Sequence, residues 1–246
     1  MISINVCSFE LERREINPPK LSTANLGKHI LCYRPMRHGS PAMSVESIDD
    51  KIIVNNYGHG GSGWTLGPGA AKYVISLLQQ QYNARQLSKN TPLAVIGAGA
   101  IGLFTALELN NQGYTDITIY AENFDDLTSH NAGGLLAPVS MDNDPALQNI
   151  IDRIGVDAYT FYKKIALHQN SQLRNGAMII PAYFSSREAS GLEPYVGTVM
   201  QPAKDVLVDF KNGTTHKMVV YDDGIFIEAE TLMHSFKLEQ SSFNKL

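Results

Sequence analysis

The alternation of apolar and polar positions predicts strands and helices in turn through the middle of the chain. Short apolar runs at residues 51–55, 93–96 and 116–121 predict strands. Longer segments at 70–87 and 100–112 have helical character, and Gly113 is typical of a helix C-terminus. The glycine-rich stretch before residue 70 predicts a loop. This order of elements predicts an α/β domain.

The pattern changes beyond about residue 145. Residues 146–168 predict a long helix that contains Gly155, and the segments 177–184, 206–210 and 216–221 alternate as antiparallel strands do. A further short strand at 224–227 and a helix at 229–238 follow. The expected fold is therefore a parallel α/β part with a smaller mixed or antiparallel sheet. Residues 1–30 have no sustained period and predict an arm or a loosely packed lead-in.

Composition and charge narrow the possible functions. The net charge is −4 and the 20 Lys and Arg residues form no run, which argues against nucleic acid as a partner. Cys7 and Cys32 are too few for a disulfide scaffold and lack metal-ligand spacing, so we expect reduced thiols and no metal site. The start of the chain lacks the pattern of a signal peptide, which predicts a cytoplasmic protein. Residues 92–109 are apolar but carry four Gly or Pro residues, so we expect no membrane span.

The glycines Gly97, Gly99 and Gly102 follow the strand at 93–96 and open the helix at 100–112. In a dinucleotide site, the first glycine permits the tight turn, the second lets the backbone approach a pyrophosphate, and the third lets helix and strand pack closely. Ala100 and Ile101 at the helix start would offer free backbone N–H groups to the phosphates.

An acidic residue strengthens this interpretation. Glu122 lies about 20 residues beyond Gly102 at the end of the next strand, where a carboxylate can accept hydrogen bonds from ribose hydroxyls. Glycine spacing alone also occurs in ordinary turns, but here strand, helix, second strand and acid occur together. The motif predicts an adenine dinucleotide, which leaves FAD and NAD as candidates.

Three blocks of the sequence resemble the D-amino-acid oxidase family of FAD-dependent oxidoreductases. The first is VIGAGAIGLFTALEL with IYAENF, the second is TSHNAGGLLAP at 128–138, and the third is RPMR at 34–37 with NNYGHGGSGWTLGPGAA from residue 55. In relatives the third block ends the chain, whereas here it precedes the nucleotide motif. The sequence thus resembles a circularly permuted member, with residues 88–92 as the linker between termini that lie close together.

The resemblance implies noncovalent FAD and a set of cofactor contacts. The loop around His59 would direct backbone N–H groups at the pyrimidine edge of the flavin, with the Thr65 hydroxyl beside them. The residues expected at the cofactor are Gly58, His59, Gly60, Gly61, Gly63, Trp64, Thr65, Gly97, Gly99, Ala100, Ile101, Gly102, Glu122, Thr128, Ala132, Gly133, Gly134 and Leu135.

The resemblance also implies substrate contacts. Arg34 matches an arginine that pairs with the substrate carboxylate, for which a planar guanidinium is suited, and the Gly61 carbonyl would lie near the substrate amine. His59 has an ordinary pKa near neutrality, which suits a general base. Hydride transfer needs alignment more than a protein base, so we interpret His59 as a packed loop histidine.

The expected function is oxidation of the C–N bond of an amino acid or amine by hydride transfer to flavin N5. The expected division is an arm (1–30), a Rossmann-like FAD-binding domain (31–139, joining 31–87 to 92–139) and a partial substrate domain (140–246). Family strands expected after residue 238 are missing, so either residues 1–30 supply part of them or the chain is a shortened version. Two alternatives stay open: a degenerate or nonenzymatic FAD-binding protein or subunit that lacks a complete substrate domain, and an NAD-dependent dehydrogenase. A homo-oligomer or a partner subunit is compatible with each of these interpretations.

Overall fold

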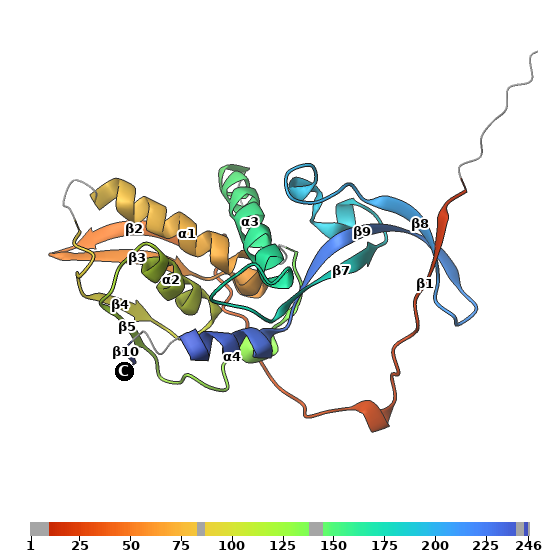
Figure 1. Ribbon diagram of the computed structural model, residues 1–246, viewed down its shortest axis with the longest axis horizontal. Coiled ribbons are helices and arrows are strands. Elements are labelled where there is room, and N and C mark those ends of the chain that lie inside the picture. Colours follow the sequence, from red (N-terminus) through yellow and green to blue (C-terminus); the bar gives the residue numbers. More distant parts are fainter. Residues whose placement is uncertain (1–9, 83–86, 138–144, 240–243, 246) are drawn as a thin grey trace, which may run out of the picture.

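The computed structural model describes residues 10–82, 87–137, 145–239 and 244–245 and has a mixed α/β fold. Helices and short sheets form one end of an elongated molecule, and a mixed sheet extends to the other end (Figure 1). The helices are α1 (Gly63–Tyr82), α2 (Ala100–Asn111), α3 (Pro145–Ala166) and α4 (Ala229–Glu239). None of them, within the described part of the chain, combines the length and apolar character that crossing a membrane requires.

A three-stranded parallel sheet carries the glycine motif. Its order is β10 (Asn244–Lys245), β5 (Ile117–Tyr120) and β4 (Leu93–Ile96), with α2 connecting β4 to β5. The strands predicted at 93–96 and 116–121 and the helix at 100–112 are confirmed. Gly113 has φ +86°, as expected after a helix end. β10 was not predicted, because two paired residues leave no periodic pattern in the sequence.

The prediction of a loop up to residue 70 is wrong after residue 62, because α1 begins at Gly63. Two glycines in its first turns allow other helices to come close. A Cβ added at Gly67 would lie 2.5 Å from the Phe104 ring of α2, and one added at Gly69 would lie 1.9 Å from the Ile154 carbonyl oxygen of α3. These glycines are therefore required by helix packing and not by a flexible loop.

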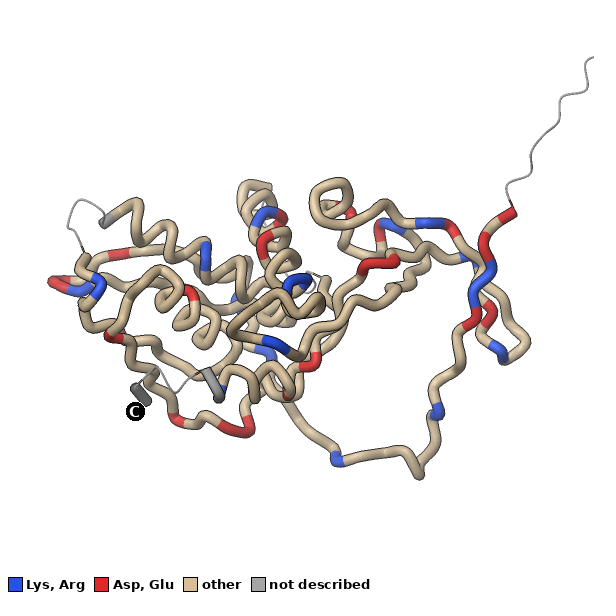
Figure 2. The backbone as a smooth tube through the Cα atoms, viewed as in Figure 1, with Lys and Arg blue, Asp and Glu red and all other residues tan. Residues whose placement is uncertain are grey.

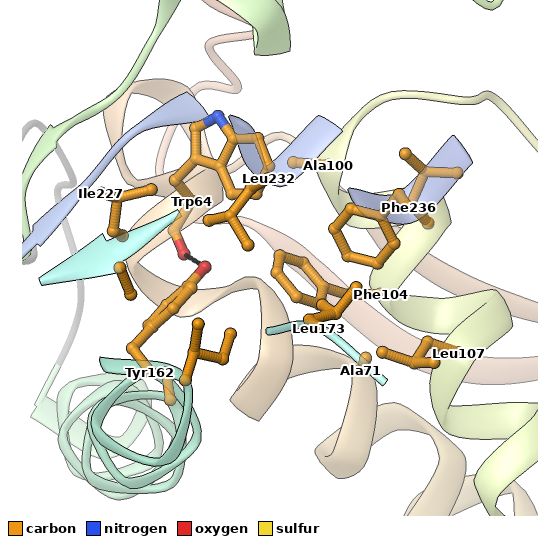
Figure 3. Close-up of a cluster of buried hydrophobic side chains, with 14 of the residues drawn as sticks. Trp64, Ala71, Ala100, Phe104, Leu107, Tyr162, Leu173, Ile227, Leu232 and Phe236 are labelled. Carbon is orange, nitrogen blue, oxygen red and sulfur yellow. Dashed lines mark hydrogen bonds between the residues drawn. The ribbon is translucent and has the colours of Figure 1, made fainter. Parts of the chain in front are cut away.

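Pro68 lies inside α1 and leaves one carbonyl of the helix without its usual partner. Proline has no N–H to donate to Trp64, four residues earlier. The Tyr162 hydroxyl of α3 donates to the Trp64 carbonyl oxygen instead, at 2.6 Å (Figure 3). Both groups are buried, so α3 satisfies a polar group that α1 cannot satisfy itself.

Replacing Tyr162 by phenylalanine is expected to lower the free energy of unfolding by about 1–3 kcal/mol, because the buried Trp64 carbonyl loses its donor. Urea denaturation at constant pH measures this difference. Tyr57→Phe is the matched control, since the Tyr57 side chain is exposed. Equal midpoints for Tyr162→Phe and the wild type would show that the buried hydrogen bond contributes nothing to stability.

A five-stranded mixed sheet forms the other part of the molecule. Its members are β1 (Glu12–Glu15), β6 (Gly134–Leu135), β7 (Ala177–Phe184), β8 (Lys204–Asp209) and β9 (Thr215–Ile227). β9 is central and pairs antiparallel with β6, β7 and β8. The two strands predicted at 216–221 and 224–227 are one strand, because β7 pairs with β9 on both sides of residues 222–223. The pairing changes register there, between Ile180 and Ala182 of β7.

Residues 12–15 of the expected arm form a strand, which the sequence pattern did not predict. β1 pairs parallel with β8 at the edge of the mixed sheet. Arg14 bridges Glu12 and Asp222, and Lys204 also contacts Asp222, so opposite charges meet where β1 lies along the edge of the sheet (Figure 2). The Arg14 guanidinium, with Lys204, lowers the pKa of Asp222 to about 2. This tertiary pairing has no counterpart in the local sequence pattern.

A hairpin precedes α1. β2 (Ala42–Ile48) and β3 (Lys51–Tyr57) pair antiparallel through a two-residue turn in which Asp49 has φ +52°. The strand predicted at 51–55 is confirmed and extends to residue 57, whereas β2 was missed because its charged and polar residues hide the alternation. The hairpin packs on α1.

Candidate functional site

The turn between β4 and α2 has the close geometry that its glycines allow. Gly97 has φ +104°, and its N–H donates to the Tyr120 carbonyl of β5 at 2.8 Å. A Cβ added at Gly102 would lie 2.0 Å from the Gly97 carbonyl oxygen. Helix α2 therefore begins close against the end of β4, with Gly99 at its N-cap. Such a helix start attracts anions through its backbone N–H groups and its dipole.

A cavity of about 610 Å³ opens beside this turn. It is lined by residues 96–99 at the end of β4, by residues 120–123 at the end of β5, and by Leu127. Gly97, Gly99 and Glu122 thus surround one space, with the Glu122 side chain exposed. The carboxyl ends of parallel strands are where open α/β sheets usually bind ligands.

Ser129 is the residue at this place that the sequence interpretation missed. It belongs to the single turn η4 (Thr128–Asn131), and its Oγ accepts a hydrogen bond from the Ala100 N–H at 2.9 Å. The expectation that the Ala100 N–H is free for a phosphate is therefore wrong, because Ser129 occupies it. Its neighbour Thr128, which the sequence interpretation chose, directs its hydroxyl to the Tyr33 carbonyl at 3.4 Å. A hydroxyl in the second block was the available signal, but only the fold shows which one reaches the helix.

Residues 132–135 lie between the two parts of the molecule. Ala132 and Gly133 are exposed, and Gly134 and Leu135 form β6 against Ile227 and Phe226 of β9. A Cβ added at Gly133 would lie 2.4 Å from the Ile227 carbonyl oxygen, so only glycine fits this approach. The predicted cofactor segment therefore joins the turn near α2 to the mixed sheet.

The predicted flavin loop around His59 belongs to the second piece of the third block. Gly58 and Gly60 have φ +81° and +55°, and residues 60–62 form the single turn η2 (Gly60–Ser62) before α1. The Gly60 N–H donates to the Pro35 carbonyl at 3.2 Å, and Met36 pairs with His59 as an isolated bridge. The structure thus brings the segment that carries Arg34 beside the glycine loop.

Two residues in the first turn of α1, just after this loop, bond to the protein itself. The Thr65 hydroxyl donates to the Ala137 carbonyl at 3.2 Å, and the Trp64 indole donates to the Ser129 carbonyl at 3.0 Å. Gly61 is exposed in η2, and Gly63 is the first residue of α1. The Thr65 hydroxyl proton, expected to face the cofactor, therefore serves a contact within the protein.

His59 is buried, with 1% of its surface exposed, and neither ring nitrogen has a hydrogen-bond partner. Burial lowers the pKa of His59 from 6.5 to about 4, because the charged ring would lose its hydration. The imidazole is therefore neutral at pH 7. A packed loop histidine is expected to be buried in this way. Its two ring nitrogens lack hydrogen-bond partners, which a ligand bound at the loop could supply.

The buried His59 makes stability depend on pH. Between pH 6.5 and about 4 the unfolded state binds the proton and the folded state does not, so the free energy of unfolding falls as the pH falls. We expect His59 to contribute a loss of about 2–3 kcal/mol between pH 7 and pH 4.5. Urea denaturation at both pH values measures it, and His59→Leu removes it. Replacement of the exposed His29 by leucine leaves the loss unchanged. Equal losses in His59→Leu and the wild type would contradict this assignment.

A family model and two solved structures match this chain. A family model described as FAD dependent oxidoreductase (DAO) matches residues 92–220, more than half of the 246 residues. Two solved structures are similar. Amadoriase I, a fructosyl amine:oxygen oxidoreductase from Aspergillus fumigatus, has 16% identity over 65% of this chain with a TM-score of 0.39. L-amino acid deaminase from Proteus vulgaris has 12% identity over 65% of this chain with a TM-score of 0.40.

This chain spans only 41% and 40% of the length of those two proteins. The search of curated proteins finds no match. The matched residues 92–220 contain the β4–α2 turn, the cavity residues of β5, η4 and β6. This chain therefore belongs to the DAO family of FAD-dependent oxidoreductases.

Proposed function

We propose that this chain binds FAD noncovalently and oxidises the C–N bond of an amino acid or amine. The meeting of the three sequence blocks in space supports this most. The Ala100 N–H of the first block donates to the Ser129 hydroxyl of the second, and the Trp64 indole of the third block donates to the Ser129 carbonyl. The Thr128 hydroxyl donates to the carbonyl of Tyr33, which precedes RPMR. Segments up to 95 residues apart thereby surround one region, as a large cofactor with several distinct parts requires.

The residues at the cavity fit an adenine dinucleotide. The N-terminus of α2 and the bare backbone at Gly97 and Gly99 would hold the pyrophosphate, and Glu122 would accept hydrogen bonds from the ribose hydroxyls. Ile96 and Tyr120 at the rim of the cavity are 79% and 40% exposed, so their apolar side chains could pack against the faces of an adenine ring.

The residues of the glycine loop fit the flavin end. The two unpaired nitrogens of His59 and the backbone of residues 58–61 lie beside the segment of Arg34. A nicotinamide ring offers no pyrimidine edge to such a loop, so this block favours FAD over NAD. When bound, FAD accepts the hydride from the substrate carbon.

The protein's own residues would orient the substrate. The Arg34 guanidinium would pair with a substrate carboxylate and so align the α-carbon, and the Gly61 carbonyl would accept a hydrogen bond from the amine. His59 is neutral and buried, so it stays an uncharged wall of the site and does not take the substrate proton. The Arg37 guanidinium donates to the Ser40 carbonyl at 2.7 Å, so Arg37 supports the loop.

Reconstitution with FAD tests this proposal. Purified protein is incubated with FAD or with NAD, desalted, and examined for a bound cofactor. Retained flavin absorbance, bleached without oxygen by some member of a panel of amino acids and amines, is the expected result. Yellow protein that no panel member bleaches would indicate a flavoprotein without this activity. Protein that retains no FAD would overturn the proposal.

A variant then tests the substrate role of Arg34. Arg34→Leu is expected to raise KM for a carboxylate-bearing substrate at least about tenfold, because a charge-assisted pair is lost. The same variant should leave KM nearly unchanged for an amine without a carboxylate. Equal effects on both substrates would remove Arg34 from the proposed role.

A further inference from the structure

Trp64 links the two ends of the proposed site. It lies in the first turn of α1, 5% exposed, and packs edge-on against Phe104 with ring centroids 5.7 Å apart. Its indole N–H donates to the Ser129 carbonyl of η4, and its own carbonyl accepts from Tyr162. Figure 3 shows the indole held among side chains of the core, next to Leu232. Both the indole N–H and the carbonyl of Trp64 are therefore held by hydrogen bonds.

Ser129 stands at the point where an anion would meet helix α2. Its Oγ accepts from the Ala100 N–H at 2.9 Å, and a hydroxyl that accepts can still donate its own proton. A Cβ added at Gly99 would lie 3.3 Å from this Oγ. The hydroxyl is thus next to the bare backbone that would face a pyrophosphate. It takes up the Ala100 N–H and offers the anion its own proton in place of that donor.

Ser129 lies in the single short turn η4, so contacts from other elements must fix the position of its backbone. Within η4 the Leu127 N–H donates to His130 Nδ1, and the His130 N–H donates to the Leu127 carbonyl. These bonds close the turn on itself, and helix α4 packs against it. The Trp64 indole supplies an anchor from a rigid helix, with a donor whose direction the packed ring system fixes.

We propose that Trp64 is a positioning residue for the cofactor: through the Ser129 carbonyl, it holds the Ser129 hydroxyl at the phosphate end of the site. This inference rests on the proposed FAD binding. It assigns the Trp64 side chain a role through Ser129, in place of the direct cofactor contact expected from the sequence.

A double-mutant cycle with Trp64→Phe and Ser129→Ala tests the proposal. Phenylalanine keeps an aromatic ring and removes the donor, and alanine removes the hydroxyl. The FAD dissociation constant is measured by calorimetry on apoprotein. We expect an increase of about threefold to tenfold for Trp64→Phe, since one neutral hydrogen bond is lost. Because both residues act through one hydroxyl, the double variant should bind FAD as Ser129→Ala does.

Phe236→Leu is the control for core packing. Phe236 is 2% exposed and packs against Phe104 and Trp64, but its side chain has no polar group for Ser129. This variant should lower the melting temperature while the FAD dissociation constant stays within twofold of the wild type. If Trp64→Phe does not fold, β-(3-benzothienyl)alanine replaces Trp64, because it keeps the shape of the indole and has sulfur in place of the N–H. Trp64 is the only tryptophan in the chain, so a tryptophan analogue enters at this position alone.

Three results would overturn the proposal. Unchanged FAD affinity in both Trp64 variants, or independent and additive effects of Trp64 and Ser129, would remove the positioning role and leave FAD binding intact. Absence of FAD binding by the wild type would overturn this inference and the proposed function together. Because the wild-type measurement comes first, failure of the function and failure of the positioning role are distinguishable.

Discussion

Replacing Gly102 by alanine is expected to weaken FAD binding at least about a hundredfold. The added Cβ would lie 2.0 Å from the Gly97 carbonyl oxygen, a distance that only movement of the backbone can relieve. Helix α2 must then move away from the turn, and its N-terminal N–H groups move with it. The loss of two hydrogen bonds to a charged phosphate, at about 1.5–3 kcal/mol each, corresponds to a hundredfold or more.

Calorimetric titration of apoprotein with FAD measures this effect. Gly27→Ala is the matched control, because an added Cβ there has no neighbour within 4 Å and Gly27 lies on an exposed segment. It should bind FAD as the wild type does. Gly102→Ala protein that is folded and binds FAD within about fivefold of the wild type would contradict a phosphate site at the start of α2.

The largest expected loss of stability comes from Gly69→Ala. Helix propensity alone predicts a gain of about 1 kcal/mol for this change inside a helix. The added Cβ would lie 1.9 Å from the Ile154 carbonyl oxygen and 2.7 Å from its carbonyl carbon, so α3 must separate from α1. We expect the free energy of unfolding to fall by about 3 kcal/mol or more, because the clash is with backbone that cannot rotate away.

Urea denaturation measures the loss of stability as a shift of the unfolding midpoint, provided that the dependence of the unfolding free energy on urea concentration is unchanged. Gly63→Ala is the matched control within the same helix, since its added Cβ would meet only the Ile101 side chain at 4.0 Å. Its stability should be equal to the wild type or higher. A Gly69→Ala protein as stable as Gly63→Ala would show that α1 and α3 do not cross as closely as described.

Elements built on local contacts were predictable from the sequence. The strands β4 and β5 and the helix α2 follow from apolar runs, from helical spacing and from Gly113 at a helix end. The long helix α3 and the strand β7 were found for the same reason. The positions of Gly97, Gly99 and Glu122 around one cavity could also be expected, because the spacing of a strand, a helix and a strand is regular.

Elements that depend on distant partners were not predictable. β1 exists because Arg14 and its neighbours pair with β8, about 190 residues away, and their local sequence favours no strand. Ser129 was passed over in favour of Thr128, because only the packing of η4 decides which hydroxyl reaches α2. The anchoring of that turn by the Trp64 indole has no signal in the sequence.

The sequence by itself determined the glycine motif, the parallel α/β unit around it and the family to which the motif points. Only the tertiary structure decided that Gly67, Pro68 and Gly69 belong to a helix. Locally these residues favour a loop, since glycine costs conformational entropy and proline lacks a donor. The close approach of α2 and α3, together with the Tyr162 hydroxyl that bonds to the open carbonyl, outweighs that local preference. Contacts between distant segments therefore set the start of α1 and place Trp64 beside the proposed site.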